Sequence, residues 1–97
     1  MAPQPAALAV VVADELTRLV RRWQQLPLDQ ALAFSAPVRA LSQRYAALVH
    51  PGLPLPDLGP AALPDQLTVV VYDALAAAAC SPARVAADLR ALLRELS

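Results

Sequence analysis

The most apolar stretch of the chain covers residues 67–80, where only Thr68 and Asp73 are clearly polar. A helix of this composition has to be buried on most of its sides, in its own fold or against a partner. The stretch is shorter than the roughly 20 residues that cross a bilayer. Its first half, 67–72, also has strong strand propensity, but no turn residue separates it from the alanine-rich second half. We therefore predict a helix over 65–80 at the centre of an all-α fold.

Three further segments, 5–25, 37–49 and 82–96, repeat apolar residues at spacings of three or four, which is typical of amphipathic helices. Ser81 and Pro82 suit the N-cap and first position of the last helix. The predicted apolar faces are Leu8, Val12, Leu16, Leu19, Trp23 and Leu26 in the first, Val38, Leu41, Tyr45 and Leu48 in the second, and Val85, Leu89, Leu92 and Leu96 in the last.

Residues 28–34 are expected to form a short helix of their own. Ser35 can cap a new helix, and Pro37 suits the first turn of that helix because its missing N–H needs no partner there. The expected architecture is a single helical domain over 1–97, folded as a small four-helix bundle with a Pro-rich strap between the helical halves.

Residues 50–64, here called the strap, hold five of the ten prolines and both glycines. Irregular segments of more than about 12–15 residues in a small domain tend to be functional or mobile. Leu53, Leu55, Leu58 and Leu63 argue against a free linker, because a solvated linker would be more polar. We expect the strap to lie across the core.

The composition is biased, with no Lys, Asn or Ile, which indicates a bacterium with a GC-rich genome. The hydrophobic fraction is 58%, above the usual 45–50% or so. This excess is consistent with an oligomer that hides apolar area by association, and equally with alanine on exposed helix faces. The formal net charge is zero, which gives no general nucleic-acid footprint.

Few residues offer chemistry. His50 and Cys80 are the only residues of their types, and neither lies in a metal-ligand spacing. The carboxylates do not cluster into a catalytic pair, so we expect no enzyme activity, no cofactor and no metal. A single cysteine excludes an internal disulfide, and no basic region precedes the first apolar run. We expect a cytoplasmic protein without a membrane partner.

The favoured function is a helical module that dimerises or binds a protein partner, in a larger bacterial complex. Arginine and tryptophan are favoured at interface hot spots, and the densest basic cluster of the chain adjoins Trp23. The leucines of the strap and the apolar face of the last helix are equally able to form a contact surface or a monomer core. The candidate contact residues are Arg18, Arg21, Arg22, Leu53, Leu55, Leu58, Val85, Leu89, Leu92 and Leu96.

Two alternatives belong to other classes. Residues 28–49 can be drawn as a DNA-binding helix-turn-helix, whose recognition helix would expose Arg39, Ser42, Gln43 and Arg44, residue types that read bases or grip phosphates. The short first helix and the zero net charge argue against it. The other alternative is a small-molecule binder. Its cavity would be lined by the central helix, with Tyr72 or Asp73 facing the ligand.

Overall fold

The computed structural model describes the chain from Pro5 to Leu96, and its side chains from Val10 onward. This part contains four α-helices and no strand, so the predicted all-α bundle is confirmed. The helices are α1 (Pro5–Gln25), α2 (Leu28–Val49), α3 (Leu63–Ala76) and α4 (Pro82–Leu96), and a short 3-10 helix (Pro60–Ala62) precedes α3.

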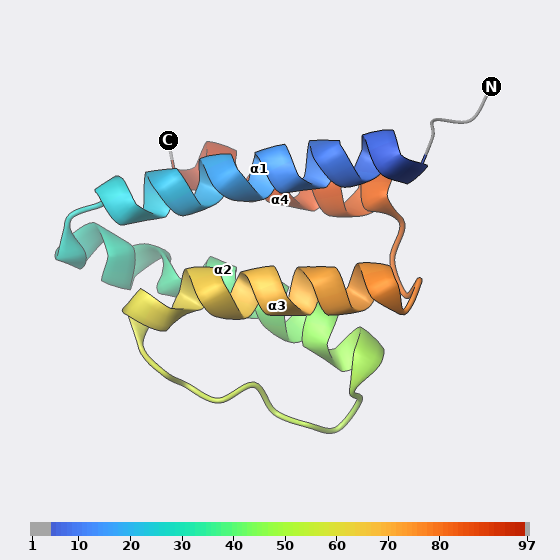
Figure 1. Ribbon diagram of the computed structural model, residues 1–97. Coiled ribbons are helices and arrows are strands. Elements are labelled where there is room, and N and C mark those ends of the chain that lie inside the picture. The colour runs from blue at the N-terminus through green and yellow to red at the C-terminus, as the bar shows by residue number, and fades with distance from the viewer. Residues whose placement is uncertain (1–4, 97) are drawn as a thin grey trace.

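The bundle consists of two parallel helix pairs (Figure 1). α1 packs chiefly against α4 and α2 chiefly against α3, whereas contacts between the pairs are fewer. Within each pair the helices run in the same direction, and the two pairs run in opposite directions. The prediction that 65–80 is central is therefore wrong, because each of the four helices belongs equally to one pair. Val69 and Tyr72 on α3 are exposed accordingly.

The predicted apolar faces form the core. On α1 and α4 every described member of the two faces is buried, while Leu8 lies outside the described side chains. α4 begins as predicted, since the backbone N–H of Arg84 donates to the Ser81 hydroxyl at 3.2 Å. Leu48 is an exception: it is exposed, because Val49 takes the inward position one turn after the buried Tyr45.

The predicted break at residues 35–37 is wrong, since α2 continues through Pro37. Ser35 caps no new helix; its hydroxyl donates to the Ala31 carbonyl at 2.7 Å, one turn back. Proline inside a helix removes one backbone hydrogen bond. Ala31 and Val38, on either side of it, are buried on the same face of α2, so packing holds the helix together across the proline.

α3 begins two residues before the predicted position and ends four residues before it. Its end is marked by Ala78, whose φ of 53° lies in the left-handed region. The N–H of Ala79 donates to the carbonyl of Ala74 at 2.9 Å, a bond that closes many helix ends when glycine occupies the left-handed position. Here alanine occupies it, so the sequence carries no recognisable stop signal.

The strap is attached to the helices at some of its residues and exposed at others. The carboxylate of Asp57 accepts a hydrogen bond from Arg39 at 2.6 Å and another from the N–H of Gly59 at 3.1 Å. Leu63 is buried and Leu55 packs partly against the core. Leu53 and Leu58 are 67% and 63% exposed, so the expectation that the strap covers the core holds for only part of it.

Candidate functional site

A hollow of about 210 Å³ lies between the end of α2, the strap and α3. We call it the strap groove. Its lining is apolar apart from one histidine and one carboxylate. The lining residues are Ala46, Val49, His50, Leu53, Pro54, Leu55, Val69, Val70 and Asp73.

The turn after α2 positions this groove. The N–H of Leu53 donates to the carbonyl of His50 at 3.2 Å, and Gly52 between them has a φ of +85°. Such a φ is costly for a residue with a Cβ. The tight turn brings Leu53 and Leu55 back beside α3, where Leu55 packs toward the core and Leu53 stays in solvent.

Exposed apolar side chains border the groove on two elements. Leu53 on the strap is 67% exposed and Val69 on α3 is 58% exposed. A second hollow of about 460 Å³ shares Leu53 and Leu55 with the strap groove, and its only polar lining side chain is Gln43. The first half of the strap therefore borders two largely apolar hollows, and a contiguous exposed apolar surface is typical of a contact site.

The apolar face of α4 belongs mainly to the core. Val85, Leu89, Leu92 and Leu96 are buried between the helices, which favours the monomer-core interpretation over a partner-binding role, and of the four only Leu92 also lines a surface cleft described below. Apolar residues at spacings of three and four are found both in core-facing helices and in partner-binding helices. The spacing shows that one face of the helix is covered, but it does not show which segment covers that face.

The basic cluster near Trp23 is divided among separate contacts. Arg22 donates from Nε to the Leu96 carbonyl at 2.8 Å and so closes the end of α4. Arg18 lies 4.0 Å from Glu15, while Arg21 is exposed beside the groove between α1 and α3. Trp23 is buried, and its indole N–H donates to the Pro60 carbonyl at 3.1 Å. Of the three arginines, Arg22 is therefore engaged within the fold, while Arg18 and Arg21 remain exposed on α1.

The surface drawn for a helix-turn-helix is not present either. Its turn lies inside the continuous α2, and Ser42 is fully buried with its hydroxyl donating to the Val38 carbonyl. Arg39 is paired with Asp57 and Arg44 with Asp88. Of the four residues proposed to contact DNA, only Gln43 is exposed with a side chain that makes no ion pair or hydrogen bond to another described residue.

Tyr72 and Asp73 are both exposed, but they face different hollows. Asp73 lines the strap groove. Tyr72 lines a hollow of about 270 Å³ between α1 and α3, together with Thr17, Arg21 and Thr68. Neighbouring residues on a helix diverge by about 100°, which is why the two residues line separate hollows. The alternative of a ligand cavity faced by Tyr72 or Asp73 stays a prediction.

A polar cluster between α2 and α4 was not predicted from the sequence. Asp88, whose side chain is 15% exposed, accepts hydrogen bonds from the Tyr45 hydroxyl at 2.6 Å, Arg84 Nε at 3.1 Å and Arg44 at 3.4 Å. Burial, followed by the bond to Asp88, raises the pKa of Tyr45. The i,i+4 spacing of Arg84 and Asp88 is visible in the sequence, but the partner on α2 is not.

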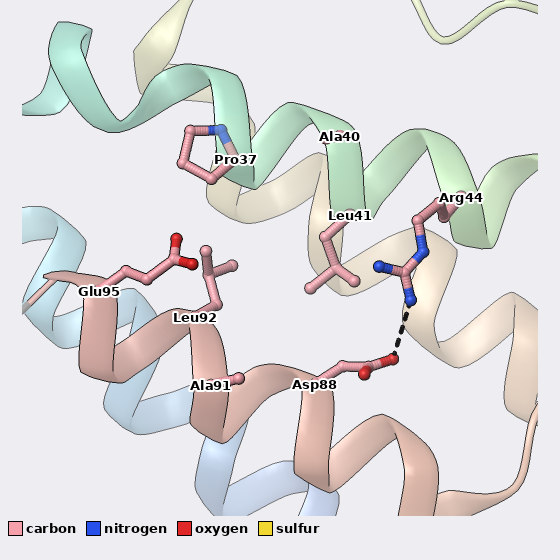
Figure 2. A pocket seen from close by; sticks show the side chains of 8 residues that line it. All are labelled: Pro37, Ala40, Leu41, Arg44, Asp88, Ala91, Leu92 and Glu95. Carbon is pink, nitrogen blue, oxygen red and sulfur yellow. Dashed lines mark hydrogen bonds and ion pairs between the residues drawn. The ribbon is translucent and has the colours of Figure 1, made fainter.

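This cluster lies at one end of a cleft of about 260 Å³ between the two helices (Figure 2). We call it the α2–α4 cleft. Glu95 lies at the opposite end, and Figure 2 shows its carboxylate directed toward Pro37. The lining residues are Pro37, Ala40, Leu41, Arg44, Asp88, Ala91, Leu92 and Glu95.

The described part of the chain was compared with the requirements of a metal site and of a membrane-spanning helix. No three His, Cys, Asp or Glu residues of this part lie close enough together to hold a metal ion. No helix in it is both long and apolar enough to cross a membrane. No protein-family model, no curated protein and no solved structure matches the chain. The functional interpretation therefore rests on the geometry of these surfaces.

Proposed function

We propose that the protein is a non-enzymatic helical interaction module whose strap groove receives apolar side chains of a partner protein. One observation carries this proposal: two aliphatic side chains on different elements, Leu53 and Val69, remain more than half exposed on a single apolar groove. Burying such a pair under a partner removes apolar area from water at roughly 25 cal/mol per Å².

The chemistry of the groove favours a protein over a small molecule. Small-molecule sites hold a few convergent polar groups that orient the ligand. Here the polar side chains are His50, which follows α2, and Asp73 on α3, and no hydrogen bond joins them in the described structure. An apolar centre with polar groups at its edge is the usual anatomy of a protein–protein contact.

We propose that the module acts in a bacterial cytoplasm, as a subunit of a larger complex. The GC-rich residue usage and the single Cys80 support this setting. The burial or pairing of Arg39, Ser42 and Arg44 removes the main support for DNA binding.

The test is site-specific photocrosslinking in lysate of the native host. A photoreactive phenylalanine analogue replaces Leu53 in one sample and the exposed Ala83 of α4 in a matched control. We expect a single protein to crosslink at position 53, to survive nuclease treatment and to disappear when Val69→Asp is added. Circular dichroism checks that this exposed substitution leaves the helices folded.

Two results would contradict the proposal. If positions 53 and 83 capture the same proteins, the groove is not a specific site. If the captured material vanishes with nuclease, the nucleic-acid alternative replaces the proposed one.

A further inference from the structure

The α2–α4 cleft has opposite charges at its two ends. Arg44 and Asp88 line one end, and Arg84, which lies outside the lining, is paired with Asp88, so the three groups together carry a net charge of +1, counted as two arginines against one carboxylate. Glu95 at the other end has no hydrogen bond or ion pair among the described side chains, although it is exposed and directed into the cleft. The cleft therefore has a positive and a negative end along its length.

Arg44 is free to leave its partner. Its distance to Asp88 Oδ2 is 3.4 Å, which is long for a charged pair. The same oxygen already accepts the Tyr45 hydroxyl at 2.6 Å, and Oδ1 accepts Arg84 Nε at 3.1 Å. Moving Arg44 away leaves both oxygens of Asp88 satisfied, so the movement has little cost in unpaired charge.

The walls of the cleft allow a close approach. Ala40 and Ala91 are exposed on its two sides, with no atom beyond Cβ, and Leu41 and Leu92 form its floor. Figure 2 shows the two helices facing one another across this shallow apolar surface. A partner surface of the same kind can come near without displacing bulky side chains.

We infer that a second copy of this chain docks face to face on the α2–α4 cleft, with Arg44 of each copy paired to Glu95 of the other. A two-fold axis that crosses the cleft at mid-length turns its positive end onto the partner's negative end, so one rotation makes both ion pairs. This is the self-complementarity that an isologous dimer requires. The surface shares no lining residue with the strap groove.

Charge reversal tests the pairing. Arg44→Glu and Glu95→Arg are each expected to raise the dimer dissociation constant about tenfold or more, because each variant places two like-charge pairs in the interface. The double variant should return the constant to within about threefold of wild type. Arg94→Glu is the matched control, since it makes the same charge change at an exposed position of α4 outside the cleft.

Cysteine crosslinking tests the orientation. In a Cys80→Ala background, Ala40→Cys faces its own symmetry mate near the axis and should oxidise to a covalent dimer. Ala83→Cys, exposed at the start of α4 and away from the cleft, should stay monomeric. Sedimentation equilibrium of the full chain gives the oligomeric state and the dissociation constants.

Three outcomes would overturn the inference: a monomeric wild type, a dimer insensitive to both single reversals, or equal crosslinking at positions 40 and 83. A dimer that is lost with Val69→Asp and not with Arg44→Glu would place self-association on the strap groove instead. The three overturning outcomes do not involve the strap groove, whereas loss of the dimer with Val69→Asp would show that this groove binds a second copy of the chain, so the two proposals fail separately.

Discussion

Arg90 on α4 donates a hydrogen bond from Nε to Oε1 of Glu15 on α1 at 3.1 Å. The pair joins the two parallel helices near mid-length. The bond from Arg22 to the Leu96 carbonyl joins the same two helices at nearly the same register. Glu15 is buried, and its second oxygen has no hydrogen-bond partner. An acidic residue on the inward side of α1 thus helps to align α4, but at a cost in desolvation.

We predict that the two members of this pair respond differently to substitution. Arg90→Ala leaves a buried carboxylate with only Arg18, 4.0 Å away, and should lower the free energy of unfolding by about 1–2 kcal/mol. Glu15→Met replaces the buried charge by an apolar side chain and should be neutral or stabilising. Urea unfolding measures both, with Arg94→Ala as the exposed control. Equal losses for both variants would contradict the account.

Pro37 offers a direct test of the continuous α2. Pro37→Ala restores an N–H that can donate to the carbonyl of Ala33, and should raise the free energy of unfolding by up to about 3 kcal/mol. Helical ellipticity should rise or stay constant. If a turn separated two helices here, the substitution would bring no such gain. Thermal unfolding followed by circular dichroism decides between these outcomes.

Ala78 at the end of α3 carries backbone strain. Its φ of 53° costs an L-residue with a Cβ about 1 kcal/mol relative to glycine. Ala78→Gly should therefore stabilise the protein by about that amount. Ala77→Gly is the matched control, because Ala77 has a φ of −80° and gains nothing from glycine. Stabilisation by both substitutions, or by neither, would be inconsistent with a strained left-handed residue.

Tyr45 makes the stability dependent on alkaline pH. Burial and the hydrogen bond to Asp88 raise its pKa, whereas the phenol of the unfolded chain ionises near pH 10. The folded state therefore keeps a proton that the unfolded state loses. The stabilising contribution of Tyr45 is complete below about pH 10 and declines as the pH rises above it.

The measurement is the free energy of unfolding as a function of pH for wild type and Tyr45→Phe. The wild-type curve should fall more steeply above about pH 10, and the difference between the two should shrink there. Tyr72→Phe leaves Tyr45 as the only tyrosine, so phenolate absorbance in that background reports its ionisation alone. If Tyr45 ionised in the folded protein at the same pH as in the unfolded chain, the contact with Asp88 would be weaker than described.

The apolar periodicity alone determined which faces of the helices are covered. Val12, Leu16, Leu19 and Trp23 follow one another at helical spacing, and all four are buried. Ser81 before Pro82 likewise marks the start of α4, where the Ser81 hydroxyl accepts the Arg84 N–H. These features are local, because helix period and capping depend on residues within one or two turns.

Only the tertiary structure decided how those helices combine. Tyr45 meets Asp88 across a sequence separation of 43 residues. Pro37 stays inside a helix because Ala31 and Val38 on either side of it are both buried. The apolar face of α4 became core, while Leu53 and Val69 stayed in solvent. The physical reason is that the spacing of apolar residues shows which side of a helix is apolar. Which segment packs on that side depends on contacts between parts of the chain that are distant in sequence.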